Sequence, residues 1–392
     1  MEVTMSDHRI YMDYNATTPL RPEVKASMIA DFDIFGNASS MHESGRLAKA
    51  RVEEARESVA ALIDAPADRV FFTSGGSESN NTVFQTMLLK GENAYRKAIV
   101  TSAIEHPCII NSAEFVKSRG VDTVFLPVDP DGRIHMDELR AALSDKTMLV
   151  SIMYANNEIG TIQDLASISR IAREAGAFMH TDAVQAAGKI RVSVKELGVD
   201  YLSLSAHKIY GPKGIGALYV RKGAPLEPLI RGGHQEQGLR AGTYNNIGIL
   251  GFGLAARLAL QDLDSFSRSV RKLRNMLKEG LEARVPNIRI NGHPREVLPN
   301  TLNVSFPGAE GEAILLSLDI MGIEASTGSA CASGSLDPSH VLMATGVGPE
   351  LAHGSIRFSL GRSTTEEDIR YALETVPPII ARLRAMSTIR SK

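Results

Sequence analysis

Seven short apolar runs alternate with segments of helical length between residues 69 and 220. The runs are rich in β-branched and aromatic residues, which favour strands. Such alternation predicts an α/β fold with a mostly parallel sheet that is covered by helices on both faces. Ligands of such sheets bind at the carboxyl ends of the strands, in the loops that follow. The expected strands cover residues 69–73, 98–101, 123–126, 148–153, 177–181, 201–205 and 216–220.

The pattern changes after Asn246, where a long apolar-periodic helix is expected over 247–262 and continues as a charged helix over 265–282. Shorter strand-like runs and a final helix over 366–386 follow. A chain of 392 residues is also longer than the chains that usually fold around a single hydrophobic core. We therefore predict a large domain over residues 16–255 and a small domain formed by residues 1–15 and 256–392.

The charge balance and the number of cysteines exclude several classes of protein. Lys and Arg total 43 against 45 Asp and Glu, so no basic excess indicates nucleic-acid binding. The two cysteines exclude a disulfide framework and a cysteine-based zinc site, and the histidines do not cluster with metal-ligand spacing. The sequence starts without a signal-peptide pattern and has no apolar stretch of the roughly 20 residues that span a bilayer. We expect a cytoplasmic protein that binds neither nucleic acid nor a membrane and holds no metal.

Three features follow predicted strands, and each has an ordinary structural explanation when it is taken alone. The glycine-rich turn at 73–79 can hold an anion on helix N–H groups, or it simply caps that helix. Asp182 can pair with a protonated ring nitrogen or a metal, or it caps a helix beginning near Ala183. Lys208 ends a buried strand, where lysine is unusual and has a lowered pKa, whereas its rival Lys213 lies in a Gly/Pro turn.

One cofactor uses all three features together. Pyridoxal phosphate needs a lysine for its aldehyde, an acid for its pyridine nitrogen and an anion cup for its phosphate. The presence of all three at strand ends of one predicted sheet therefore indicates a pyridoxal-phosphate enzyme.

Three further residues are candidates for chemistry, and the second cysteine is not. Cys331 lies in a small, polar segment, so it is either a nucleophile on a mobile loop or an incidental surface thiol. Cys108 has apolar neighbours, and we interpret it as structural. His106 either stacks on a ring and moves protons or is a structural histidine. Arg357 either captures a substrate carboxylate or forms a structural ion pair.

Ten short motifs, in order along nearly the whole chain, resemble those of the pyridoxal-phosphate-dependent cysteine desulfurases of the nitrogenase-maturation and iron–sulfur-cluster types. The most specific are SAHKIYGPKG at 205–214 and GSACASG at 328–334. The others lie at 13–19, 35–37, 73–79, 105–106, 156–160, 180–185, 240–243 and 355–362.

The resemblance implies the type I fold of pyridoxal-phosphate-dependent transferases, with a mostly parallel seven-stranded sheet in the large domain and a smaller α/β C-terminal domain that carries the catalytic cysteine. It also implies a homodimer. The catalytic residues would be Lys208, which bonds the cofactor, Cys331, which forms a persulfide, and His106, which stacks on the ring as an acid or base. The binding residues would be Asp182 for the pyridine nitrogen, Gln185 and Asn157 for the phenolic oxygen, Gly76, Ser77, Ser205 and His207 for the phosphate, Thr243 for the phosphate of the neighbouring subunit, and Arg357 and Asn37 for the substrate carboxylate.

The reaction that the resemblance implies is the removal of sulfur from L-cysteine. Lys208 would take the Cα proton, and the Cys331 thiolate would attack the substrate sulfur. L-Alanine would leave, and the persulfide would pass to an iron–sulfur scaffold or another sulfur-acceptor protein. The chain departs from the family pattern at Ala38, which follows Asn37 where proline is frequent. A selenocysteine lyase, an aminotransferase of the same fold and a non-catalytic scaffold are the alternatives.

Overall fold

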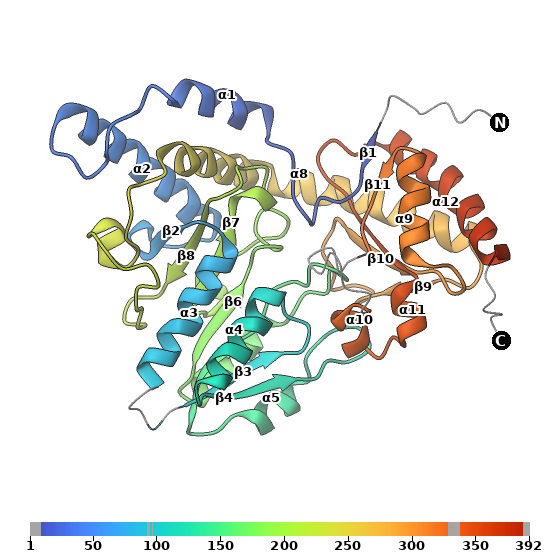
Figure 1. Cartoon of the computed structure of the whole chain (residues 1–392), viewed down its shortest axis with the longest axis horizontal. Helices are drawn as coiled ribbons and strands as arrows, with labels where there is room; N and C mark the ends of the chain where they lie inside the picture. The colour runs from blue at the N-terminus through green and yellow to red at the C-terminus, as the bar shows by residue number, and fades with distance from the viewer. Residues whose placement is uncertain (1–8, 92–94, 96, 328–337, 387–392) are drawn as a thin grey trace.

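A seven-stranded sheet forms the centre of the larger part of the molecule (Figure 1). The computed structural model describes residues 9–91, 95, 97–327 and 338–386. The strand order is β4-β3-β5-β6-β7-β8-β2, and only β8 runs antiparallel to its neighbours. The predicted mostly parallel sheet is confirmed. Its strands are β2 (Val70–Thr73), β3 (Ala98–Ser102), β4 (Asp122–Leu126), β5 (Thr147–Ser151), β6 (Phe178–Asp182), β7 (Tyr201–Ser205) and β8 (Gly216–Val220).

Adjacent strand residues point to opposite faces of this sheet, and each face has its own apolar core. Phe71 and Leu149 pack with α3 (Gly76–Gly91) and α4 (Pro107–Ser118), which lie on one face. Phe72 and Val150 pack on the other face, in the larger core that includes residues of α2, α6 and α8. The two-sided burial explains why the strands are almost continuously apolar. The remaining helices that belong to this part are α1 (Pro22–Asp31), α2 (Glu43–Leu62), α5 (Met136–Ala142), α6 (Leu165–Glu174) and α7 (Val194–Leu197).

A second, smaller core lies around an antiparallel three-stranded sheet, β12-β10-β9. The N-terminal strand β1 (Ile10–Tyr11) pairs in parallel with β11 (Ile323–Glu324), which places the start of the chain on this part. α8 (Asn246–Arg284) is a single unbroken helix, so the boundary predicted at 255/256 falls inside it, and the exact domain limits stay a prediction. The other elements are β9 (Arg289–Asn291), β10 (Thr301–Ser305), β12 (Ser355–Ser359), α9 (Gly311–Ile320), α10 (His340–Ala344), α11 (Pro349–His353) and α12 (Glu366–Met386).

The helices that the structure describes include none with the length and apolar character needed to cross a membrane.

His180 is a buried titratable group in the middle of the sheet. Its two ring nitrogens lie 2.8 Å from Ser151 Oγ and 3.2 Å from Ser203 Oγ, on the neighbouring strands. Complete burial disfavours the imidazolium and lowers the pKa of His180 from 6.5 to about 3. The side chain is therefore neutral in the folded protein at pH 7.

We predict that this histidine makes the protein sensitive to acid. The folded pKa lies below the unfolded one, so the stabilisation is complete above about pH 6.5 and is lost as the pH falls toward the folded pKa. The loss from His180 amounts to about 1.4 kcal/mol of unfolding free energy per pH unit. In urea titrations below about pH 6.5, the unfolding free energy should change less steeply with pH in His180→Gln than in the wild type, by about 1.4 kcal/mol per pH unit. The exposed control His135→Gln should keep the wild-type slope, and an unchanged slope in His180→Gln would refute the assignment.

Candidate active site

Ten of the predicted site residues line one cavity of about 290 Å³ at the carboxyl ends of the parallel strands. The last residues of β6 and β7, together with the segments that follow β2, β3, β5, β6 and β7, supply nine of them, and β12 of the smaller part supplies the tenth. This convergence follows from the parallel strands, whose carboxyl ends meet at one edge of the sheet. The ten residues are Gly76, Ser77, His106, Asn157, Asp182, Gln185, Ser205, His207, Lys208 and Arg357.

Lys208 lies in the short 3₁₀ turn Ala206–Lys208 that directly follows β7. Its side chain is half-buried, and Nζ donates to the backbone oxygens of Asn15 at 2.6 Å and Ala16 at 2.7 Å. Lys213 is exposed in the next turn and does not line the cavity. The structure therefore places Lys208, and not its rival, where it can react with a bound molecule.

Asp182 ends β6 with its carboxylate held in place by two donors. Asn80 Nδ2 donates to Oδ2 at 2.7 Å, and the backbone N–H of Val184 donates to Oδ1 at 2.9 Å. The second bond resembles a helix cap, but residues 184–189 form turns and no helix begins at Ala183. A buried, fixed carboxylate of this kind suits a protonated ring nitrogen.

His106 is the N-cap residue of α4, and its Nδ1 accepts the backbone N–H of Cys108 at 3.2 Å. Because Nδ1 is the acceptor, the proton of the neutral ring is on Nε2. Burial lowers the pKa of His106, Asp182 opposes this effect, and the nearby Lys208 and His340 side chains lower the pKa further. The imidazole is therefore suited to donate from Nε2 while it remains neutral.

Cys108 also lines this cavity, although the sequence indicated only a structural role. Its Sγ lies 3.0 Å from His106 Nδ1 and accepts from Asn80 Nδ2 at 3.2 Å, while the side chain also packs against the core under α3 and α4. Burial raises the pKa of the thiol to about 12. A thiol that remains protonated is a poor nucleophile, so its position beside the site does not make Cys108 reactive.

The start of α3 forms a cradle for an anion. Gly76 opens the helix, and a Cβ at that position would lie 2.8 Å from Val184 Cγ2, so only glycine fits there without displacing its neighbour. Ser77 and Ser205 bring hydroxyls to the same cavity, and the positive end of the α3 dipole is directed at it. Burial and the cations of Lys208 and Lys213 lower the pKa of His207 to about 4, so this side chain is a neutral hydrogen-bonding group.

Arg357 brings a buried guanidinium from β12. It donates to Asp13 Oδ1 at 2.6 Å and to the backbone oxygen of Asn157 at 3.0 Å. Its Nε is buried and has no hydrogen-bond partner among the described residues. The sequence analysis offered a structural ion pair as one alternative for Arg357, and the contact with Asp13 is such a pair. Arg357 nevertheless also lines the cavity.

Two of the predicted site residues that the structure describes, Asn37 and Thr243, do not line this cavity, and Cys331 lies outside the described residues. The chain that precedes it is held by paired backbone bonds between Ser326 and Arg357, and the chain that follows it is held by Ser339, whose Oγ donates to Glu158 at 2.5 Å. Asn37 and Thr243 are exposed, and Asn37 Oδ1 accepts the backbone N–H of Ser39 at 2.9 Å. Their roles stay predictions.

Comparison with known proteins identifies the family. The family model of the class-V aminotransferases matches residues 10–371. Curated cysteine desulfurases named IscS are 48% identical in Dictyoglomus turgidum, with 98% of this chain and 97% of the relative covered, and 46% identical in Methanosarcina thermophila, with 100% and 96% covered. The chain belongs to the cysteine desulfurases of the class-V aminotransferase family. Solved structures agree: a protein described as NifS-like superposes on this cysteine desulfurase with a TM-score of 0.90 at 38% identity, covering 95% of this chain and 100% of that one.

Members of this family depend on pyridoxal phosphate, and the cavity of this cysteine desulfurase fits that group. The α3 N-terminus with Gly76 and Ser77 suits a phosphate, the fixed carboxylate of Asp182 suits the pyridine nitrogen, and Lys208 suits the aldehyde. The family, the enzyme class, the fold and the cofactor predicted from the sequence are confirmed.

Four site residues were missed by the sequence analysis. Asp13 pairs with Arg357, Asn15 contacts Lys208, Asn80 holds Asp182, and Lys189 bonds both Asn15 and Gln185. The sequence held a weak signal for the first two, because Asp13 and Asn15 are part of a motif shared with the family. Nothing in the sequence around Asn80 or Lys189 indicated their contacts.

Proposed function

We propose that this enzyme removes sulfur from L-cysteine and carries it as a persulfide on Cys331. The observation that carries the proposal is the convergence of Lys208, Asp182, His106 and Arg357 on one cavity, although they are far apart in the sequence. A solved structure described as SspA in complex with cysteine is 34% identical and has a TM-score of 0.79, which supports cysteine as the substrate.

Each of the cavity residues that hold the cofactor would contact one part of it. Lys208 would hold the cofactor aldehyde, Asp182 the pyridine nitrogen, and Gln185 and Asn157 the phenolic oxygen. Gly76, Ser77, Ser205 and His207 would hold the phosphate. Bound pyridoxal phosphate supplies an electron sink that stabilises negative charge at the substrate Cα.

The protein's own groups would then move the proton and the sulfur. Arg357, with Asn37, would orient the substrate through its carboxylate, and the Lys208 amine would take the Cα proton. Nε2–H of His106 would donate to the substrate or cofactor. The Cys331 thiolate would attack the substrate sulfur, forming an S–S bond as the C–S bond breaks with its electron pair left on carbon. Protonation of that carbon completes L-alanine, so cysteine plus thiol gives alanine plus persulfide without an external oxidant or reductant.

Product analysis tests this proposal. Purified enzyme with L-cysteine and a reducing agent should release L-alanine and sulfide in equal amounts. A 2-oxo acid formed from cysteine, with the amino group retained on the cofactor, would favour the aminotransferase alternative. Activity with selenocysteine alone would favour the lyase.

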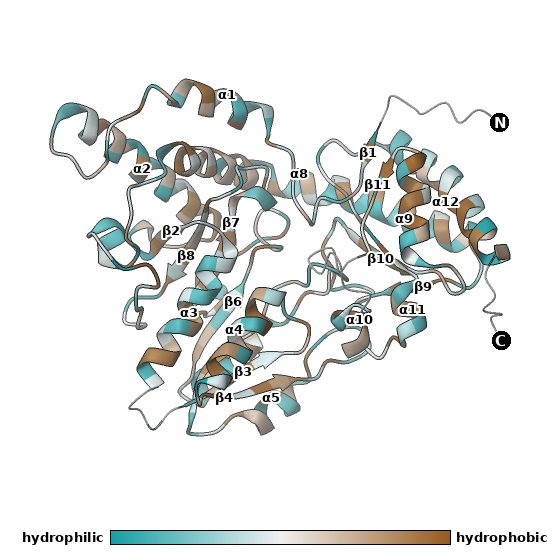
Figure 2. Ribbon diagram, in the orientation of Figure 1, coloured by the Kyte–Doolittle hydropathy of each residue, from teal (hydrophilic) through white to brown (hydrophobic). Residues whose placement is uncertain are grey.

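We further propose that the active enzyme is a homodimer in which Thr243 reaches the cofactor phosphate of the partner subunit. A segment rich in exposed apolar side chains supports this proposal, since exposed apolar surface marks interfaces. This apolar segment extends from α1, where Figure 2 shows apolar stretches, to the start of α2 and carries Ile29, Phe32, Phe35, Met41 and Leu47, which are 53–90% exposed. Asn246 donates to the backbone oxygens of Ile34 and Gly36, which connects this apolar segment to the residues next to Thr243.

Light scattering checks the dimer. Phe35→Asp should give a monomer that loses most of its desulfurase activity, because Phe35 is 83% exposed in one chain and the charge would disrupt the interface. The control Phe115→Asp, at an exposed position on α4, should remain dimeric and active. A wild-type monomer with full activity would contradict the proposal.

We also propose that the enzyme acts in the cytoplasm and passes the persulfide sulfur to an iron–sulfur scaffold or another acceptor protein. It is supported by the resemblance to the iron–sulfur-cluster type of the family. Pull-down of the persulfidated enzyme with candidate scaffolds, followed by transfer of labelled sulfur, would identify the acceptor.

A further inference from the structure

Lys189 is a second lysine beside the active site, and it is only 3% exposed. Its Nζ donates to Asn15 Oδ1 at 2.9 Å and to Gln185 Oε1 at 2.6 Å. Both acceptors are neutral amide oxygens, and the groups that shift the pKa of this amine include no carboxylate. Buried lysines are usually paired with an acid, so this one requires another explanation.

The two acceptors of Lys189 connect it to Lys208 through a short hydrogen-bond network. Gln185 Nε2 donates to the backbone oxygen of Asn15 at 2.9 Å. The same Asn15 oxygen accepts from Lys208 Nζ at 2.6 Å. Lys189 therefore fixes Asn15 by its side chain and, through Gln185, by its backbone oxygen as well.

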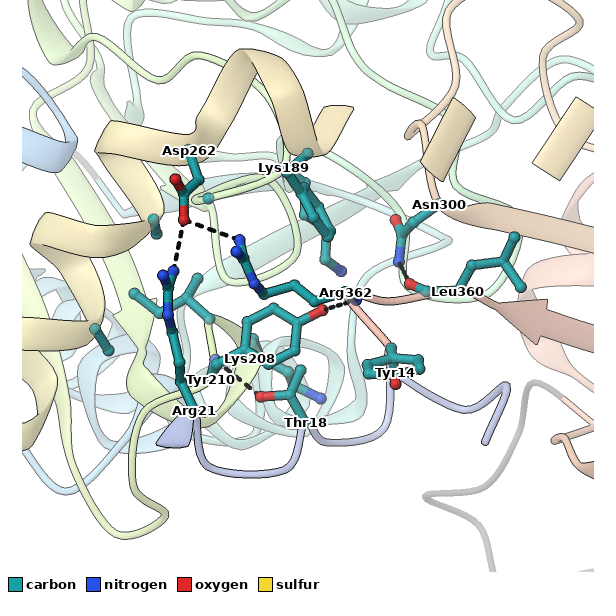
Figure 3. Close-up of a pocket in the computed structure, with 15 residues that line it drawn as sticks. Tyr14, Thr18, Arg21, Lys189, Lys208, Tyr210, Asp262, Asn300, Leu360 and Arg362 are labelled. Carbon is teal, nitrogen blue, oxygen red and sulfur yellow. Dashed lines mark hydrogen bonds and ion pairs between the residues drawn. The ribbon is translucent and has the colours of Figure 1, made fainter. Parts of the chain in front are cut away.

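The backbone before Lys189 explains how the two lysines come together. Gly188 has a φ of +72°, and a Cβ at this position would lie 2.7 Å from Ile209 Cγ2. Only glycine allows this close approach, which packs the turn that carries Lys189 against the segment that carries Lys208. Both lysines line a cavity of about 20 Å³, enough for about one water molecule, which Figure 3 shows with Tyr14 and Asn300.

The electrostatics of this position favour a neutral amine. Burial lowers the pKa of Lys189 well below its usual value, and the nearby cations Lys208 and Arg357 lower it further. A neutral amine has two protons, which match the two acceptors. Lys189 can thus hold the network without adding a positive charge beside Lys208.

We propose that Lys189 is a positioning residue for Lys208. By fixing Asn15 and Gln185, it sets the place of the Asn15 oxygen to which the Lys208 amine is bonded when that amine is not attached to the cofactor. Lys189 itself does not touch the reacting atoms. This inference rests on the proposed role of Lys208, so its test must separate the two.

Lys189→Met keeps the length of the side chain and removes the donor. We expect apoprotein of this variant to react with pyridoxal phosphate about tenfold more slowly, because the Lys208 amine is no longer held. We also expect the pH midpoint of the absorbance of the bound cofactor to shift by about 0.5 unit or more. The rate constant kcat should fall about tenfold, while KM for cysteine changes by less than about threefold because Arg357 is unaffected.

Lys189→Ala provides a second measurement. The space left by the side chain should admit ethylamine, which should restore part of the reconstitution rate, whereas ethanol should not. The matched control is Lys195→Met, because Lys195 is 67% exposed and pairs with Asp64 outside the cavity. This variant should behave like the wild type in every measurement.

Borohydride reduction and peptide mapping of each sample separate the outcomes. Cofactor on a residue other than Lys208 in the wild type would overturn the proposed function itself. Cofactor on Lys208, with wild-type reconstitution rate and absorbance midpoint in Lys189→Met, would overturn only the positioning role. Loss of the folded state in both variants would also contradict it, because Lys189 would then be needed for folding and not for placing Lys208.

Discussion

Cys331→Ala is expected to abolish the release of sulfur from L-cysteine, with a loss of about 10³-fold or more. No nucleophile would remain to take the sulfur. Binding of the cofactor and of cysteine should persist, because the residues proposed for these tasks do not include Cys331, and all of them except Asn37 and Thr243 line the described cavity. The variant should therefore still change its absorbance when cysteine is added, while assays for alanine and sulfide show no turnover.

The matched control is Cys108→Ala. Because burial raises the pKa of the Cys108 thiol to about 12, this group is not a thiolate at neutral pH. The backbone N–H that donates to His106 Nδ1 is retained in the variant, so the proton of the histidine should stay on Nε2. We expect most of the activity to remain, with a packing cost of about 1 kcal/mol in stability.

Mass spectrometry after brief exposure to cysteine decides between the two thiols. An added sulfur atom should be found on the peptide that contains Cys331. Sulfur on Cys108, or alanine production at the normal rate by Cys331→Ala, would overturn the assignment and favour an aminotransferase-like function.

Lys208→Ala is the second substitution with a large expected effect. Turnover should fall about 10³-fold or more, because the group proposed to take the Cα proton is lost. Cofactor should still bind through the phosphate cradle and Asp182, but it should no longer be fixed to the protein by borohydride. Absorbance spectra and peptide mapping of the reduced protein measure both effects.

Lys213→Ala is the control for that experiment. Lys213 is exposed and lies outside the cavity, so this variant should keep its activity and its borohydride-fixed cofactor. Reduced cofactor on Lys213 in the wild type, or normal turnover by Lys208→Ala, would show that the lysine was chosen wrongly.

The sequence was sufficient to predict the sheet and the residues along its binding edge. The strands are buried on both faces, so their apolar runs are continuous and stand out from the helices between them. Polar residues directly after such runs are expected at one edge of a parallel sheet, which is why Asp182 and Lys208 could be placed beside the glycine-rich turn. The sequence also predicted that Lys213 lies in a turn, because Gly211, Pro212 and Gly214 surround it.

Contacts between residues far apart in the sequence were decided only by the tertiary structure. Asn15 reaches Lys208, 193 positions later, because the N-terminal segment runs from the two-stranded sheet of β1 and β11 in the smaller part to the edge of the seven-stranded sheet. The bond is made by the backbone oxygen of Asn15, and a backbone oxygen gives no signal in the identity of the residue. The role of Lys189 could not be predicted for a similar reason. Its partners are neutral amide groups that packing brings close to it, and the charge pattern of the sequence does not indicate them. Local periodicity determines which face of an element is buried, whereas the pairing of polar groups across elements depends on how those elements pack.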